Sequence, residues 1–249
     1  MFERKKFINP WEGSIEPFEI IKGVYFVGTY QASSHLIDTG DGLILIDTGY
    51  ANTLYLLVDS IYKLGFKPTD VKYIINTHWH GDHVEGTSAF SQLSGAKTII
   101  GKEDFEKAQK YFTADIKISD GDTLSLGNIT ISFMETPGHT KGTLSFFFNV
   151  NDNGKTYRVG SFGGAGANTL VKEKFDFDDC RTAYLNSIER LQKEHVDVFI
   201  GNHTWNNDTF NKAKILKETG KNTFIDHTLW HKFLDFCKKR LEEIIEREK

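Results

Sequence analysis

The sequence predicts an α/β protein built from two similar halves, and three observations support that prediction. Short apolar runs rich in Val, Ile and aromatic residues, the pattern typical of strands, fill much of the first half of the 249 residues. A longer segment with apolar residues at helical spacing follows several of them. The second half then repeats the order of strands followed by a helix. Because both halves share this plan, we expect one α/β domain that spans residues 1–249 and ends in a helix.

The first half is predicted to contain strands at 24–27, 34–38, 43–47 and 73–76. The Asp41-Gly42 pair between two of these runs predicts a β-hairpin. Residues 53–64 carry apolar side chains at helical spacing, and Gly65 follows as a stop signal.

The second half is predicted to contain strands at 98–100, 129–133, 144–150, 157–159 and 196–200. The aromatic run 146–148 indicates a strand buried on both faces rather than a ligand pocket. Helices are predicted over 178–194 and from 229 to the end, and the second of these is amphipathic.

Composition favours a small-molecule substrate over a nucleic acid or a membrane. The formal net charge is -4, and no basic cluster suited to a phosphate backbone precedes the last turns of the chain. No window approaches the ~20 apolar residues that span a bilayer. Residues 1–17 lack an apolar stretch, so we expect no secretory signal peptide. Cys180 and Cys237 are expected to be reduced thiols, and a cytoplasmic location is therefore expected.

A cluster of potential metal ligands follows the predicted strand 73–76: His78, His80, Asp82 and His83. Strand alternation sends His78 and His80 to the same side, and the turn that follows can fold Asp82 and His83 back toward them. Imidazole nitrogen and carboxylate oxygen are zinc ligands, and catalytic zinc sites keep one position open for water. The chain has only 9 histidines, so three within one turn favour a metal site over a chance cluster.

Two further histidines follow predicted strands in the same way. Pro137 and Gly138 predict a sharp turn that places His139 at a strand exit, and His203 follows Gly201 after the last predicted strand. A lone histidine after a strand is usually a polar loop residue, so the assignment of these two as ligands depends on the first cluster.

The remaining histidines are expected to be structural. His35 falls within a predicted strand, and His195 ends a predicted helix. His227 and His231 are four residues apart, but no third ligand accompanies them, so we expect both on a helix surface.

Four segments together resemble the metallo-β-lactamase superfamily in order and spacing. They are Leu-Ile-Asp-Thr-Gly at 45–49, His-x-His-x-Asp-His at 78–83, Pro-Gly-His-Thr at 137–140 and Gly-Asn-His at 201–203. The resemblance runs from about residue 24 to about residue 203. It implies an αββα sandwich, with the active site at the edge where the strands of the two sheets end.

The resemblance also implies two zinc ions per chain. It assigns three ligands to each ion: His78, His80 and His139 to the first, and Asp82, His83 and His203 to the second. Asp47 resembles the buried aspartate of the family, which orients ligands rather than binding the metal.

Ser161 stands where glyoxalase-like and ribonuclease-like members carry a bridging Asp, and where one β-lactamase subclass carries a Cys ligand. A hydroxyl cannot replace a bridging carboxylate. The pattern therefore resembles the β-lactamase subclass with three His at one zinc and Asp plus two His at the other. Ser161 is expected to line the pocket wall.

The expected activity is hydrolysis, in which a metal-bridging hydroxide attacks a carbonyl carbon. Asp82 would ligate and also act as the catalytic residue that holds the proton of the hydroxide away from its target. β-Lactam amide hydrolysis is the nearest pattern. The expected cytoplasmic location favours thioester or lactone hydrolysis as an alternative, although the missing acid at 161 weakens the thioester case. A mono-iron persulfide dioxygenase is a further alternative that also expects this acid.

Overall fold

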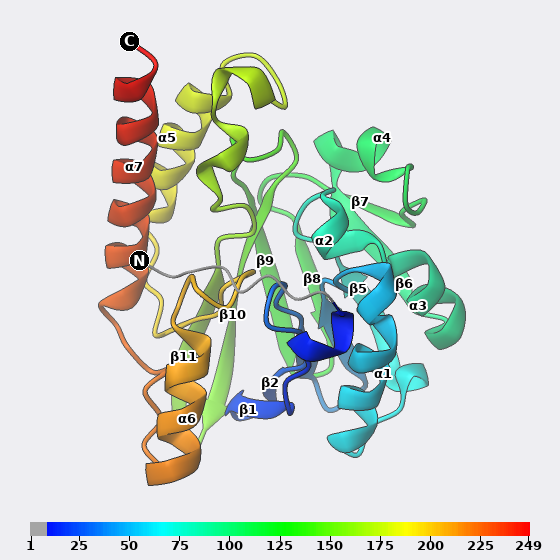
Figure 1. The fold of residues 1–249 in the computed structure, drawn as a ribbon. Helices are drawn as coiled ribbons and strands as arrows, with labels where there is room; N and C mark the ends of the chain where they lie inside the picture. Colours follow the sequence, from blue (N-terminus) through cyan, green and yellow to red (C-terminus); the bar gives the residue numbers. More distant parts are fainter. Residues whose placement is uncertain (1–8) are drawn as a thin grey trace.

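The computed structural model describes residues 9–249, which form two β-sheets with helices on their outer faces (Figure 1). The first sheet has the strand order β1-β2-β3-β4-β5-β6-β7, and the second has the order β12-β11-β10-β9-β8. The strands of the first sheet are Phe18–Ile21 (β1), Val24–Phe26 (β2), His35–Asp38 (β3), Leu43–Ile46 (β4), Val71–Ile75 (β5), Lys97–Gly101 (β6) and Ile116–Ile118 (β7). Those of the second are Thr123–Leu126 (β8), Ile129–Glu135 (β9), Leu144–Asp152 (β10), Lys155–Ser161 (β11) and Val198–Phe199 (β12).

The α-helices divide between the two halves of the chain. The first half contains Leu54–Lys63 (α1), Gly81–Val84 (α2), Thr87–Ser94 (α3) and Phe105–Ala108 (α4), and the second contains Cys180–Leu191 (α5), Thr209–Thr219 (α6) and Leu229–Arg247 (α7). Short 3-10 helices lie at Pro10–Gly13, Ala51–Thr53, Pro68–Asp70, Lys102–Asp104, Ala167–Thr169 and Lys172–Lys174.

The predicted hairpin joins β3 to β4 in antiparallel register, with Asp38 opposite Leu43. Gly40 and Gly42 in its turn have φ of 83° and 132°, a range that glycine adopts without the penalty of a Cβ atom. From β4 to β7 the strands run parallel, whereas the second sheet is antiparallel except for the pair β11 and β12.

The main core lies between the two sheets. Ile44 and Ile75 of the first sheet belong to one buried cluster with Phe133 and Phe146 of the second. Their neighbours Leu45 and Ile74 face the opposite side of the first sheet. This alternation explains why the central strands are continuous apolar runs, since both faces of each sheet are buried.

Helices cover the outer face of each sheet, which gives the α/β/β/α layers visible in Figure 1. Leu57 and Ile61 of α1 pack on the first sheet. On the second sheet, Phe147 packs with Tyr184 of α5 and Trp230 of α7. The predicted αββα sandwich with two similar halves is therefore confirmed. Because Phe147 faces these helices while Phe146 and Phe148 face the other sheet, the aromatic run is buried on both faces as predicted.

Some local predictions differ from the structure. The last strand is shorter than expected, since β12 contains only Val198 and Phe199. His195 lies beyond the end of α5, and His227 precedes α7, so neither lies within a helix. Cys180 and Cys237 are buried free thiols on α5 and α7, as predicted.

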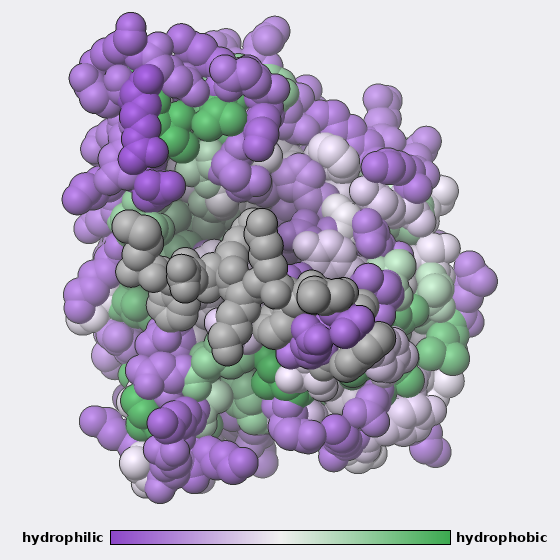
Figure 2. Space-filling model, in the orientation of Figure 1, coloured by the Kyte–Doolittle hydropathy of each residue, from purple (hydrophilic) through white to green (hydrophobic). Residues whose placement is uncertain are grey.

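The predicted absence of a signal peptide concerns residues 1–17, of which residues 1–8 lie outside the described part of the chain. Within the described residues, no helix is both long and apolar enough to cross a membrane. Figure 2 shows a largely hydrophilic face with separate apolar patches.

Burial of His35 in β3 predicts acid sensitivity. Burial lowers the pKa of this imidazole from 6.5 to about 3, so the folded state holds it neutral while the unfolded state protonates it below pH 6.5. Stability is therefore lost as the pH falls below 6.5, by ~1.4 kcal/mol per pH unit from this residue.

We expect urea unfolding of His35→Gln between pH 6 and 4 to show a shallower loss of unfolding free energy than the wild type. Both proteins are measured in the same zinc-containing buffers, so that contributions of other groups cancel in the difference. Equal slopes would contradict the assignment.

Candidate metal centre

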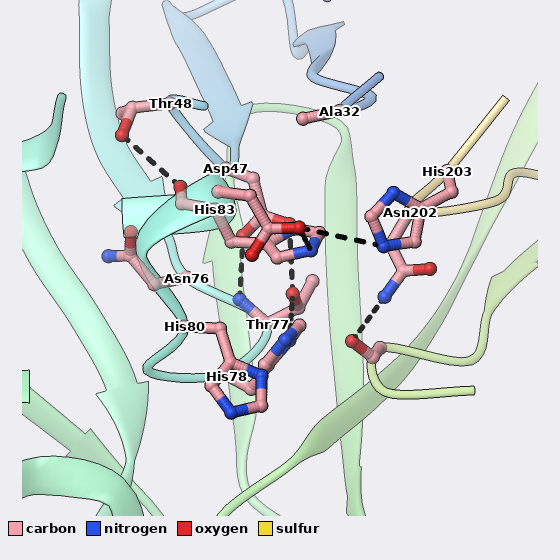
Figure 3. Close-up of polar contacts among 12 residues, drawn as sticks. Ala32, Asp47, Thr48, Asn76, Thr77, His78, His80, His83, Asn202 and His203 are labelled. Atoms are coloured by element: carbon pink, nitrogen blue, oxygen red, sulfur yellow. Dashed lines mark hydrogen bonds and ion pairs between the residues drawn. The ribbon is translucent and has the colours of Figure 1, made fainter. Parts of the chain in front are cut away.

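Three loops bring the six predicted ligands together at one edge of the sandwich. The loop after β5 supplies four of them, and the loops after β9 and β12 supply one histidine each. The ligand atoms fall into two groups, each with its atoms within 4.8 Å of one another: His78, His80 and His139, and Asp82, His83 and His203. Figure 3 shows the histidines of the first loop side by side, with His203 facing them from a separate segment.

The first group consists of three imidazoles at nearly right angles to one another. The ring centroids of His78 lie 4.8 Å from His80 and 4.7 Å from His139, and those of His80 and His139 are 4.7 Å apart. Nδ1 of His80 and Nε2 of His139 are separated by 2.9 Å. These nitrogens therefore face a common space.

The second group contains the only carboxylate among the six residues. Oδ2 of Asp82 lies 3.5 Å from Nε2 of His83 and 3.8 Å from Nε2 of His203. The His78 and His83 rings are 4.3 Å apart between centroids, which places the two groups side by side.

Asp47 is connected to both groups by hydrogen bonds. This carboxylate is 1% exposed, and it accepts hydrogen bonds of 2.8 Å from the backbone N–H of Thr77, the hydroxyl of Thr77 and Nδ1 of His83. Asp47 also has an unusual φ of 56°, at the turn that follows β4. Its contacts hold the start of the ligand loop and the His83 ring, and its role as a residue that orients metal ligands stays a prediction.

The hydrogen bonds of the Nδ1 atoms indicate which ring nitrogen carries the proton. The Thr77 hydroxyl donates its hydrogen bond to Asp47, so it accepts one from Nδ1–H of His78 at 3.0 Å. Nδ1 of His139 donates to the carbonyl of Gly166 at 2.6 Å, and Nδ1 of His203 donates to the carbonyl of Gln31 at 2.8 Å. In each ring Nε2 is then the unprotonated nitrogen, the form that binds a metal.

Two buried nitrogen atoms, one in each group, support a metal ion at both groups. Nε2 of His78 and Nε2 of His83 are both inaccessible to solvent and lack a hydrogen-bond partner. A buried polar atom left unpaired is costly, and native proteins rarely tolerate one without a reason. Because one such atom belongs to each group, the residues fit two metal ions.

The first group is neutral at pH 7. Burial lowers the pKa of His80 to about 4 and that of His139 to about 3, and burial with the neighbouring histidines places the pKa of His78 well below its usual value. Neutral imidazole is the ligand form, so no proton has to leave when a metal binds here.

The second group carries charge. Burial favours the neutral forms of Asp82 and His83, but their mutual attraction outweighs it, so the pKa of Asp82 is lowered and that of His83 is raised. Asp47 adds to the rise for His83. Asp82 is therefore ionised at pH 7, as a metal-binding carboxylate must be.

Asp104 was not identified from the sequence, yet it joins two of the ligand loops. The buried carboxylate accepts hydrogen bonds from the Thr140 hydroxyl at 2.6 Å, the Gly142 N–H at 2.7 Å and the Trp79 N–H at 3.1 Å. Burial raises the pKa of Asp104 to about 6. In the sequence, Asp104 lies in the charged segment Lys102–Asp104, and such segments are typical of a protein surface.

Ser161 is the last residue of β11, opposite Phe146 in the sheet, and it is 3% exposed. Its role as a residue of the pocket wall stays a prediction.

Comparison with known proteins agrees with the fold described above. The sequence model of the metallo-beta-lactamase superfamily matches residues 27–203. The chain resembles the structure of BJP-1, a subclass B3 metallo-beta-lactamase of Bradyrhizobium japonicum, with a TM-score of 0.88 and 27% identity over 96% of both chains.

The relatives found by sequence comparison are named after different activities. An N-acyl homoserine lactonase of Bacillus cereus is 29% identical over 203 residues, which cover 67% of this chain and 79% of the relative. A hydroxyacylglutathione hydrolase of Chelativorans sp. (strain BNC1) is 35% identical over 92 residues. That match spans only 34% of the relative's length and 37% of this chain.

The two groups predict separable metal losses. We expect His139→Ala to lose mainly the first metal equivalent and His203→Ala mainly the second, because each removes one of three donors. Metal content is measured by mass spectrometry of gel-filtered protein. Ser161→Ala is the control and should keep both equivalents. Full metal content in His203→Ala, or loss of one metal in Ser161→Ala, would contradict the assignment.

Asp47→Asn should weaken metal binding although residue 47 touches no metal. The amide carries no charge to support the Nδ1–H of His83, and such outer partners are worth ~10–100-fold in affinity. Competition with a chromogenic chelator measures the change. Asp59→Asn is the matched control, because Asp59 lies on the exposed face of α1 and its carboxylate pairs with Lys63. Unchanged affinity in Asp47→Asn would contradict the anchoring role.

Proposed function

The chain belongs to the metallo-beta-lactamase superfamily, and we propose that it is a zinc hydrolase with two ions per chain that cleaves β-lactam amides. The observation that carries the proposal is the pair of adjacent donor groups, three histidines beside one aspartate and two histidines. Nitrogen-rich sets with one carboxylate suit zinc, and three protein donors per ion leave a position for water or substrate.

Zinc ions held by these groups would lower the pKa of water toward neutrality and polarise a carbonyl oxygen. The protein contributes the orientation of the reacting groups. Ionised Asp82, a member of the second group, would accept a hydrogen bond from the attacking oxygen, which would direct a lone pair of that oxygen at the carbonyl carbon. The C–O bond would form, the C–N bond would break, and the proton that the attacking oxygen loses would pass to the leaving nitrogen, which leaves a carboxylate and an amine.

The hydroxyl of Ser161 favours an amide substrate over a thioester substrate. The resemblance places a bridging acid at this position in glyoxalase-like members, and this chain offers no carboxylate there. The BJP-1 likeness covers nearly the whole chain, whereas the hydroxyacylglutathione hydrolase match covers 37% of it. Both observations favour β-lactams as the first substrate to test.

Lactone hydrolysis is the second candidate, favoured by one observation. The Bacillus cereus N-acyl homoserine lactonase aligns over 67% of this chain, a longer match than that of the hydroxyacylglutathione hydrolase. A lactone is an ester in a ring, so the same attack on a carbonyl carbon would open it, with oxygen as the leaving atom.

A panel of three substrates tests the proposal: nitrocefin, an acyl homoserine lactone and an acyl thioester of glutathione. We expect zinc-loaded protein to open nitrocefin with kcat/KM below the ~10⁴–10⁸ M⁻¹s⁻¹ range of efficient enzymes. His78→Ala, which lacks one donor of the first group, is the blank.

Equal nitrocefin rates in the wild type and the blank would contradict the β-lactam assignment. The substrate of the panel that the wild type hydrolyses faster than the blank would then replace it. Metal analysis of the purified protein gives an independent outcome. Near two zinc ions per chain supports the hydrolase, whereas a single iron would move the assignment to a persulfide dioxygenase.

A further inference from the structure

A third cluster of metal-ligating side chains lies outside the metal centre. Its members are His195, Asp197 and His227, whose ligand atoms lie within 4.8 Å of one another. His195 follows α5, Asp197 precedes β12, and His227 precedes α7. Packing of the second half of the chain therefore brings together donors from two segments about 30 residues apart in sequence.

A single oxygen is the centre of this cluster. Oδ1 of Asp197 lies 2.7 Å from Nε2 of His195 and 2.7 Å from Nδ1 of His227. The two imidazole rings lie nearly parallel, at an interplanar angle of 17°, with their centroids 5.9 Å apart. Both rings thus direct a nitrogen at the same carboxylate oxygen.

The carboxylate is held rigidly while the imidazoles remain accessible. Oδ2 of Asp197 accepts the Arg158 N–H at 2.7 Å, and the Asp197 N–H donates to the Arg158 carbonyl at 2.8 Å. The side chain of Asp197 is 12% exposed, against 64% for His195 and 53% for His227. An ion in solvent can therefore reach two exposed donors and one donor that is already oriented, as outer hydrogen bonds orient metal ligands elsewhere.

We propose that His195, Asp197 and His227 form a separate site for a divalent transition-metal ion, with zinc as the ion. Around a tetrahedral zinc ion at ~2.0–2.1 Å, neighbouring donors lie ~3.3 Å apart. The two short distances must therefore lengthen by ~0.6 Å, a movement that rotation of exposed imidazoles supplies. Two imidazoles with one carboxylate suit zinc, copper or nickel rather than magnesium or calcium, which prefer oxygen donors.

The position of the site gives it a structural consequence. The bound ion would connect the segment after α5, the start of β12 and the residue that precedes α7. The backbone already joins two of these, because the Asp226 N–H donates to the Asp197 carbonyl at 2.9 Å. Zinc would therefore hold the beginning of the C-terminal helix against the second sheet, and it would stabilise the folded chain by mass action.

The site shares no donor with the metal centre. Asp197 precedes β12, whereas His203 follows it. Substitutions at His195 or His227 should therefore leave hydrolysis and the first two metal equivalents unchanged.

Zinc titration of the native protein tests the proposal. Protein with its metal centre filled is titrated with further zinc by calorimetry, and bound metal is counted after gel filtration. We expect the wild type to bind one additional equivalent, and His195→Ala and His227→Ala to bind none. His231→Ala is the matched control, because it removes an exposed histidine near the start of α7 that contacts the Gln192 carbonyl instead of Asp197. It should retain the additional equivalent.

Thermal unfolding supplies a second readout. The wild-type midpoint should rise with zinc added beyond two equivalents, and the rise should vanish in His195→Gln and His227→Gln, which keep a hydrogen-bonding side chain. No additional equivalent in the wild type, or its persistence in the His195 and His227 variants, would overturn the proposal. Failure of the hydrolase assignment would instead appear in the first two equivalents and in the substrate panel.

Discussion

The arrangement of the candidate metal centre depends on the hydrogen bonds that the buried carboxylate of Asp47 accepts. Burying an ionised group is costly unless hydrogen bonds compensate it, and Asp47 receives three of them at 2.8 Å. Through His83 it fixes one member of the second group, and through the Thr77 hydroxyl it sets the tautomer of His78 in the first. One side chain at the end of β4 thereby orients both groups, even though it belongs to neither.

The sandwich then determines how the two halves meet at the site. Four of the six donors follow β5 in the first sheet, and the other two follow strands of the second sheet, so the distance between sheets sets the spacing of the ligands. Direct bonds hold this junction closed. The Leu144 N–H donates to the Thr77 carbonyl at 2.8 Å, and Asp104 accepts hydrogen bonds from the loops after β5 and β9. A close approach at Gly163, where a Cβ would lie 1.9 Å from the Leu144 carbonyl oxygen, requires glycine there.

Much of this arrangement was predictable from local patterns. Central strands are apolar runs because both of their faces are buried, and the histidines of the first loop stand out because they lie within one turn. The edge strands Phe18–Ile21 and Ile116–Ile118 were missed, since they are short and half exposed. Asp104 was missed for a different reason, because its partners Thr140 and Gly142 are distant in sequence and only packing brings them near.

The partners of the histidines outside the metal centre were also not predictable from their spacing in the sequence. Spacing along the chain related His227 to His231, because a helix would place residues four apart on one face. His227 precedes that helix, and its partners are His195 and Asp197.

Charge at the metal centre bears on which substrates it can favour. Asp82 is the only anionic residue among the six donors, and position 161 contributes a hydroxyl instead of a second carboxylate. Two divalent ions held by one carboxylate leave a more positive site than two ions held by two carboxylates. A concentrated positive charge in a partly buried site attracts anionic groups and stabilises negative charge that develops on a carbonyl oxygen. A hydroxyl in place of a bridging carboxylate at position 161 would therefore make the whole centre more positive while the other six donors remain, which gives a physical reason why similar ligand sets could serve different carbonyl substrates.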